Sequence, residues 1–203
     1  MDLSSIPVID HHAHALLRER GPFDLPGFQR FFTESDDPRI HSNDAGQTLF
    51  FRWATKELAA YFGCEPTAAA VLVARNALQP DALARRLFRD ANLAALLVDY
   101  GFEATVNLTP AEMQAKLPCR IERILRLETM AQDLILENES YDRFLEAFTD
   151  RVENARASGH VGLKSIIAYR TGLAIREWSR EEGLTAFRRS RERANREGAV
   201  RLA

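Results

Sequence analysis

The spacing of apolar residues changes between two periods along this chain, and each change marks the end of a predicted element. Short apolar runs bounded by polar or turn residues predict buried strands at residues 7–10, 93–98, 120–127 and 161–169. Another extended run begins at Val200. Residues 16–48 are rich in Gly, Pro, Asp and Phe without a sustained period, which predicts a long loop.

Helices are predicted between the strands, and their ends carry residues that start or stop helices. Apolar residues at helical spacing predict a helix over 50–62 that Gly63 ends, and Pro66 and Pro80 open two more. Residues 45–90 therefore form a helical excursion after the first strand.

Two more helices are predicted nearer the C-terminus. Ser140 caps a helix that Gly159 ends, and Ser179 with Glu182 has the spacing of a capping box before a basic helix that Gly198 ends. Because strands and helices alternate, we expect right-handed βαβ units and a parallel sheet.

Composition and charge narrow the classes of function. The formal net charge is −2, with 27 basic and 29 acidic side chains, so no field favours nucleic acid or an anionic membrane. The Arg-rich residues 188–196 are interleaved with Glu and Ala, which indicates a solvated helix face. Cys64 and Cys119 lie far apart without CxxC spacing, and no apolar leader precedes the first strand. We therefore expect a cytoplasmic protein that binds a small molecule.

Three of the five histidines fall within residues 11–14, at the end of the first predicted strand. Alternate residues of a strand point the same way, so Asp10, His12 and His14 share one face and His11 takes the other. The two imidazoles at this spacing can bind one divalent metal, and the Asp10 carboxylate can fix a ring tautomer from outside the metal shell. The alternative is that these histidines bond to backbone groups at a strand end.

Five segments of the chain carry a resemblance to a known family. In order they are Ile9-Asp10-His11-His12-Ala13-His14-Ala15-Leu16, Leu58-Ala59 with Phe62-Gly63-Cys64, Leu97-Val98-Asp99-Tyr100-Gly101-Phe102, Leu125-Arg126-Leu127-Glu128, and Leu163-Lys164-Ser165-Ile166-Ile167-Ala168-Tyr169-Arg170-Thr171-Gly172-Leu173. The first resembles the first-strand signature of the amidohydrolase superfamily. The others resemble its amidohydrolase-2 branch, which includes the N-terminal domain of FluG-type proteins.

This resemblance implies an α/β fold in which residues 1–203 are the N-terminal portion of a (β/α)8 TIM barrel. The chain would supply about the first four β/α units and the start of strand five, with a helical insertion after strand one. The resemblance also implies a divalent metal at the carboxyl ends of the strands, held by His12 and His14. Zinc is the first choice, with manganese or iron as alternatives.

Members of the superfamily add further groups to the metal site. Lys164 is the candidate for a fourth-strand ligand, which some branches carboxylate on its amine; the alternative is an ion pair inside the barrel. Tyr169, Arg170 and His41 are candidates for substrate binding, because a phenol and a guanidinium can bind a carboxylate and His41 lies in the long loop. Asp99 and Glu128 follow strands two and three, where we expect them to cap the next helix.

The remaining strands and the expected catalytic aspartate lie beyond residue 203. We therefore expect a fragment that a C-terminal half completes, or a homo-oligomer that closes a barrel. The predicted activity is hydrolysis, in which metal-activated water attacks a small amide-like or carboxylate-bearing substrate. A metal-dependent decarboxylase of the same superfamily and a catalytically inactive, self-associating half-barrel are the alternatives.

Overall fold

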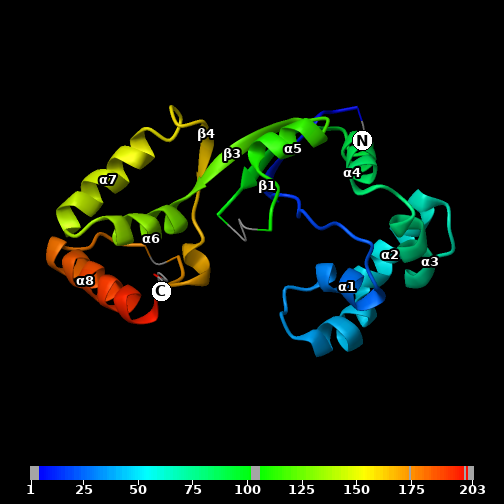
Figure 1. Cartoon of the computed structure of the whole chain (residues 1–203), viewed down its shortest axis with the longest axis horizontal. Helices are drawn as coiled ribbons and strands as arrows, with labels where there is room; N and C mark the ends of the chain where they lie inside the picture. The colour runs from blue at the N-terminus through cyan, green and yellow to red at the C-terminus, as the bar shows by residue number, and fades with distance from the viewer. Residues whose placement is uncertain (1–4, 102–105, 174, 199, 201–203) are drawn as a thin grey trace. The chain divides into compact units, whose positions relative to one another are not determined.

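The structure is a computed structural model that describes residues 5–101, 106–173, 175–198 and 200. The chain divides into two units (Figure 1). Unit 1 comprises Met1–Leu16, Asn92–Ala115 and Cys119–Ala203, and unit 2 comprises Leu17–Ala91 with Lys116–Pro118. Unit 1 contains the sheet and unit 2 is helical.

A four-stranded parallel sheet forms the centre of unit 1. Its strands are β1 (Val8–His14), β2 (Leu93–Asp99), β3 (Arg120–Arg126) and β4 (His160–Lys164), in that order across the sheet. The prediction of a parallel α/β arrangement is confirmed. Because each strand pairs with its neighbour in sequence, β1 and β4 are the two edges.

The central strand β2 provides most of the buried sheet surface. Leu96 and Val98 are 4% and 0% exposed, and Met113 of α5 (Pro110–Lys116) is fully buried. A continuous aliphatic run is typical of a parallel strand that is buried on both of its faces. Helix α5 is not predicted from the sequence.

Strand β1 departs from regular pairing. Asp10 pairs with Leu96 and Ala13 pairs with Val98, so three steps along β1 match two steps along β2. Such a bulge shifts the direction of the side chains that follow it. The strict alternation predicted for residues 10–14 is therefore wrong.

Three helices of unit 1 pack together, namely α6 (Leu127–Glu137), α7 (Tyr141–Glu153) and α8 (Arg180–Glu197) (Figure 1). Their shared core contains Ile135 and Phe187. Arg191 of α8 donates to the carbonyl oxygens of Ile135, at 2.7 Å, and Asn138, so it satisfies acceptors at the C-terminal end of α6.

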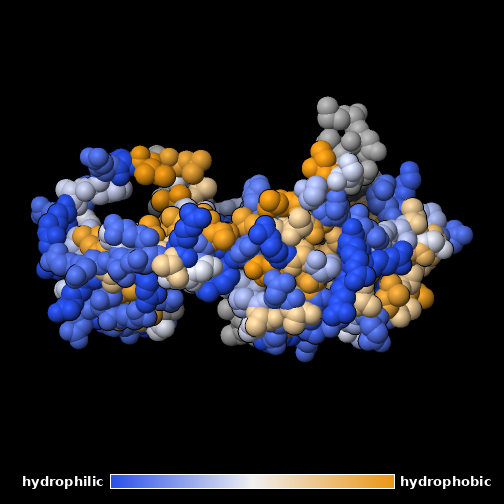
Figure 2. Space-filling view, turned by 90° about the horizontal axis from the view of Figure 1, so that it is seen from above, coloured by the Kyte–Doolittle hydropathy of each residue, from blue (hydrophilic) through white to orange (hydrophobic). Residues whose placement is uncertain are grey.

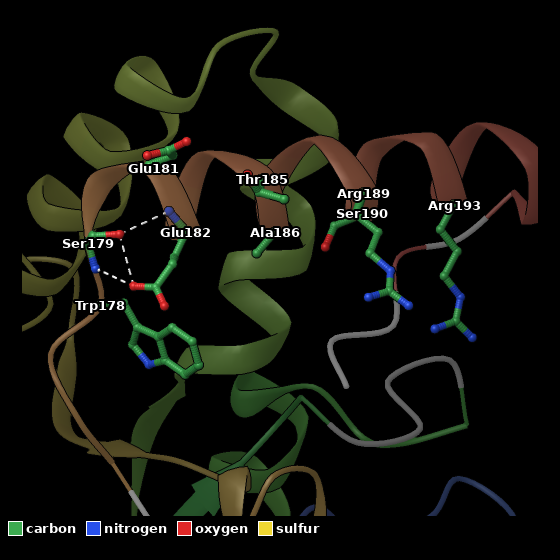
Figure 3. A pocket seen from close by; sticks show the side chains of 9 residues that line it. All are labelled: Trp178, Ser179, Glu181, Glu182, Thr185, Ala186, Arg189, Ser190 and Arg193. Carbon is green, nitrogen blue, oxygen red and sulfur yellow. Dashed lines mark hydrogen bonds between the residues drawn. The ribbon is translucent and has the colours of Figure 1, made fainter.

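The N-terminus of α8 has the capping box that the sequence predicts. The Ser179 hydroxyl accepts from the backbone N–H of Glu182, and the Glu182 carboxylate accepts from the backbone N–H of Ser179 at 2.9 Å (Figure 3). Gly198 ends the helix with a φ of 73°, a conformation that glycine adopts without steric cost.

Unit 2 is built from α1 (Leu25–Gln29), α2 (Leu49–Phe62), α3 (Ala68–Asn76) and α4 (Pro80–Asp90). Its core joins Phe28, Phe51, Ala59 and Val71. Gly63 ends α2 in the left-handed region, as predicted.

Several predicted boundaries in the N-terminal part are wrong. Thr67, whose hydroxyl accepts from the Ala70 N–H, caps α3 in place of Pro66. The predicted loop over 16–48 contains α1 and the short helical turns Arg30–Phe32, Ile40–Asp44 and Ala45–Gln47. The turns are too short to show a helical period in the sequence.

Other predicted boundaries in the C-terminal part are also wrong. Strand β4 ends at Lys164, and a 3-10 turn at Ile167–Tyr169 replaces the rest of the predicted strand. Helix α7 ends at Glu153, six residues before Gly159. The fifth extended run from Val200 falls on residues 201–203, which lie outside the described residues.

Among the helices of the described ranges, none combines the length and the apolar character that a membrane crossing demands.

Replacing Ser179 by Ala is expected to lower the free energy of unfolding by about 1 kcal/mol, because the first turn of α8 loses its side-chain cap. Chemical denaturation followed by circular dichroism measures this change. Thr185→Ala, at an exposed position in the middle of the same helix, is the matched control and should leave stability unchanged or slightly raised. Equal effects of both variants would contradict the capping role.

Candidate metal centre

The candidate residues lie at the carboxyl ends of the parallel strands of unit 1. His14, Asp99, Arg126 and Lys164 are the last residues of β1, β2, β3 and β4. His12 lies two residues before the end of β1. Since all four strands run the same way, these side chains gather at one end of the sheet.

Side chains from the two edge strands meet above one face of the sheet. With a strand spacing of about 4.8 Å, β1 and β4 would lie about 14 Å apart in a flat sheet. Lys164 Nζ nevertheless lies 3.4 Å from His12 Nε2. The His12 and His14 ring centroids are 6.4 Å apart, so the two imidazoles lie close to each other at this end of the sheet.

Asp99 is the most deeply buried polar residue of this region, with 0% exposure. Its carboxylate accepts from Arg126 Nε at 2.9 Å and forms an ion pair with Lys164 Nζ at 3.0 Å. Arg126 also bonds to Asp99 through Nη2, and the Gly101 backbone N–H donates to Oδ1 at 2.9 Å. Burial alone would raise the pKa of Asp99, but these hydrogen bonds outweigh it and lower that pKa.

The hydrogen bonds of the two imidazoles indicate their tautomers. His14 Nδ1 lies 3.4 Å from the Asp99 carbonyl oxygen, a long hydrogen bond in which the imidazole is the donor. The lone pair of His14 is then on Nε2. In the contact between His12 Nε2 and Lys164, the ammonium is the donor, so the lone pair of His12 is also on Nε2.

The pKa of His14 supports a neutral imidazole. Burial lowers this pKa, and the charges of Lys164 and Arg126 lower it further, against the hydrogen bond to the Asp99 carbonyl, which raises it. A neutral imidazole is the form that binds a metal.

A pocket of about 390 Å³ lies beside these groups. His12 and Lys164 line it, together with His11, Leu97, Ile124, Gly162, Leu163 and Ser165. His11 reaches the same pocket as His12 although strict alternation would separate them, and the bulge in β1 accounts for this.

Ser165 connects the pocket to the start of α6. Its hydroxyl donates to Glu128 Oε1 at 2.5 Å and accepts from the Ile167 N–H at 3.2 Å. The second bond starts the turn that ends β4. Glu128, predicted to cap a helix, lies in the first turn of α6 and accepts from this serine.

The other predicted site residues lie elsewhere. Asp10 Oδ1 accepts from the backbone N–H of His12 at 3.0 Å, so its carboxylate bonds to the main chain of β1. Tyr169 is 82% exposed, and it and Arg170 follow β4 in the 3-10 turn and its cap. The pocket lining ends at Ser165. His41 belongs to unit 2, where its Nε2 contacts the Ser35 carbonyl oxygen.

Within the described part of the chain, no three His, Cys, Asp or Glu side chains are grouped so that they could hold a metal ion. The chain brings together two imidazoles and a lysine ammonium. A third anionic or neutral ligand would have to come from Lys164 after it loses its charge, or from polypeptide other than the described residues.

A larger hollow of about 590 Å³ lies along α8, with Trp178 near the N-terminus of the helix and Arg189 and Arg193 further along it (Figure 3). Its lining contains no histidine or cysteine. The smaller pocket beside His12 is therefore the better candidate for a metal.

Sequence reasoning missed the importance of Asp99 and Arg126 and the place of His11. Asp99 and Arg126 are 27 residues apart in the sequence, and only the pairing of β2 with β3 shows that they meet. A buried strand that ends in an acidic residue next to one that ends in a basic residue was the available signal.

Comparisons with known proteins give one informative match. The chain matches no family model and no curated protein sequence. A crystal structure at 1.40 Å resolution from Lactobacillus casei ATCC 334 is similar, with a TM-score of 0.80 and 27% sequence identity. That protein is provisionally named a metal-dependent hydrolase. The match covers 98% of this chain and 51% of that one, so this chain spans about half its length.

Replacing Asp99 by Asn is expected to lower the free energy of unfolding by about 3 kcal/mol at pH 7, because Arg126 and Lys164 lose their buried counter-ion. The carboxyl pKa is lowered on folding, so its stabilisation is complete above its ordinary pKa of 3.8 and is lost as the pH falls through the folded value. Denaturant titrations should therefore show that the two proteins converge well below pH 3.8. A difference that does not depend on pH would contradict this assignment.

Proposed function

We propose that the pocket at the carboxyl ends of β1 and β4 is the centre of a metal-dependent hydrolase of the amidohydrolase type, with His12 and His14 as metal ligands. The proposal is supported by the pair of imidazoles on β1, whose ring centroids are 6.4 Å apart. The Nε2 lone pair of His12 accepts from Lys164 in the structure and would turn to the metal when it binds. The name of the L. casei protein supports the same class of reaction.

Two neutral imidazoles are donors that suit a borderline divalent ion such as Zn²⁺, with Mn²⁺ or Fe²⁺ as alternatives, and further ligands would have to complete the shell. When bound, the ion would lower the pKa of a water molecule and polarise the carbonyl of a small amide-like or carboxylate-bearing substrate. The chain's own contribution is orientation. The Asp99 carbonyl holds the His14 ring, and the Asp10 carboxylate holds the backbone of His12 at the bulge.

Other roles in this reaction are also proposals. Lys164 would join the metal shell only after carboxylation of its amine, since its ammonium is paired with Asp99. Tyr169 and Arg170 are proposed to contact the substrate. An aspartate from beyond residue 203 is proposed to move the proton.

We also propose that further strands extend the sheet at β1 and β4. Apolar patches interrupt the polar surface of the molecule (Figure 2). On the edge strands, Val8 and Ile9 are 44% and 57% exposed, and Val161 and Leu163 are 54% and 49% exposed. Apolar side chains on unpaired edges favour pairing with more strands. The proposed source is polypeptide equivalent to the unmatched half of the L. casei protein, and a second copy of this chain is the alternative.

Replacing His12 or His14 by Ala is expected to weaken zinc binding at least about tenfold, because each variant removes one of two imidazole ligands. Equilibrium dialysis with elemental analysis measures the affinity. Binding should also weaken as the pH falls below the ordinary imidazole pKa of 6.5, where protons compete with the metal. His41→Ala and His160→Ala are the controls and should bind zinc like the wild type. Equal zinc binding by all five proteins would overturn the proposal.

Chains of 203 residues in isolation are expected to self-associate through the sheet edges. Replacing Val161 or Leu163 by Lys should shift the population toward monomer, because a charge on an edge strand opposes strand pairing. Sedimentation velocity over a range of concentrations measures the change. Val73→Lys, at a residue of α3 that is 71% exposed, is the control and should behave like the wild type. A wild-type chain that stays monomeric at every concentration would show that the edge strands do not mediate self-association.

A further inference from the structure

We propose that Lys164 is the cation of an anion-binding subsite, in which its ammonium takes a carboxylate group of the substrate and Asp99 positions it. The inference rests on the proposed function, because it takes the pocket beside His12 as the substrate site. It assigns Lys164 to substrate binding in the state that the structure shows.

The charges at the strand ends do not balance. Lys164 and Arg126 contribute two positive charges, with side chains that are 17% and 10% exposed, and Asp99 contributes one negative charge at 0% exposure. Across the described ranges, Asp99 is the one carboxylate paired with either cation. Lys164, Arg126 and Asp99 together therefore carry a net positive charge, and the nearby Glu128 carboxylate is bound to the Ser165 hydroxyl and not to Lys164. An anion added at Lys164 would offset that positive charge.

The hydrogen bonds of this cluster leave the Lys164 ammonium with a donor for a ligand. They leave the Asp99 carboxylate with no free acceptor. Asp99 already accepts from Arg126, Lys164 and the Gly101 N–H, so its carboxylate is fully engaged. A lysine ammonium has three N–H donors. One points to Asp99 at 3.0 Å and a second to His12 Nε2 at 3.4 Å. The third is available on a residue that lines the pocket.

The walls of the pocket strengthen such an interaction. Leu97, Ile124 and Leu163 are apolar and line the same space as Lys164. A charge-assisted hydrogen bond is stronger where the surroundings have a low dielectric constant. The preferred ligand is a compact planar anion, and a carboxylate fits the pocket of about 390 Å³.

An anion also reconciles Lys164 with a metal at His12. An ammonium 3.4 Å from the ligating nitrogen would repel a divalent cation. A carboxylate bound between the Lys164 ammonium and the metal ion would offset the charges of both. The competing role, a carboxylated Lys164 that ligates the metal, would remove the ammonium altogether.

Two substitutions separate these roles. Lys164→Arg keeps the positive charge but has no primary amine to carboxylate, and Lys164→Met removes the charge at a similar volume. Lys116→Met, which removes an ammonium from unit 2, is the matched control. The probe is acetate, titrated into each folded protein before and after zinc loading, with binding followed by NMR chemical shifts.

The proposal predicts that the Arg variant binds acetate within about threefold of the wild type, whereas the Met variant binds at least about tenfold more weakly. Zinc affinity should survive in the Arg variant. Equal acetate binding by the wild type and the Met variant would overturn the subsite. Loss of zinc from both variants would overturn it in favour of a carboxylated ligand. A wild type that takes up no zinc but shows the predicted acetate pattern would refute the proposed function alone.

Discussion

A single buried carboxylate ties together the functional end of the sheet. Asp99, at the end of β2, binds Arg126 from the end of β3 and Lys164 from the end of β4, and its carbonyl oxygen meets His14 at the end of β1. An isolated buried charge is costly, so this carboxylate is stable only with its cations. The same contacts fix the positions of Lys164 and His14, the residues to which we assign the anion site and one metal ligand.

The order of the strands explains why residues far apart in sequence share one site. Parallel strands in sequence order bring all four carboxyl ends to one side, which is where such sheets place their ligands. Among the described residues, β1 and β4 are the outer strands of the sheet, and apolar residues on both are exposed. The similar L. casei protein is about twice as long as this chain. Further strands at β1 and β4 would fit that difference in length.

The sequence predicts the parts of this fold that local patterns determine. The aliphatic run of β2, the cap at Ser179 and the stop at Gly63 are local signals, and each appears where it is predicted. The end of β4 is mispredicted because residues 166–169 are apolar like a strand, while the Ser165 hydroxyl starts a turn. The ion pair of Asp99 with Arg126 depends on strand pairing, which no local pattern contains.

Anomalous diffraction from crystals grown with zinc measures whether His12 and His14 hold one divalent ion. If both imidazoles bind the ion, an anomalous peak is expected within about 2.1 Å of each Nε2. A peak bound to other residues, or full zinc occupancy that leaves both rings more than about 4 Å from the ion, would contradict it.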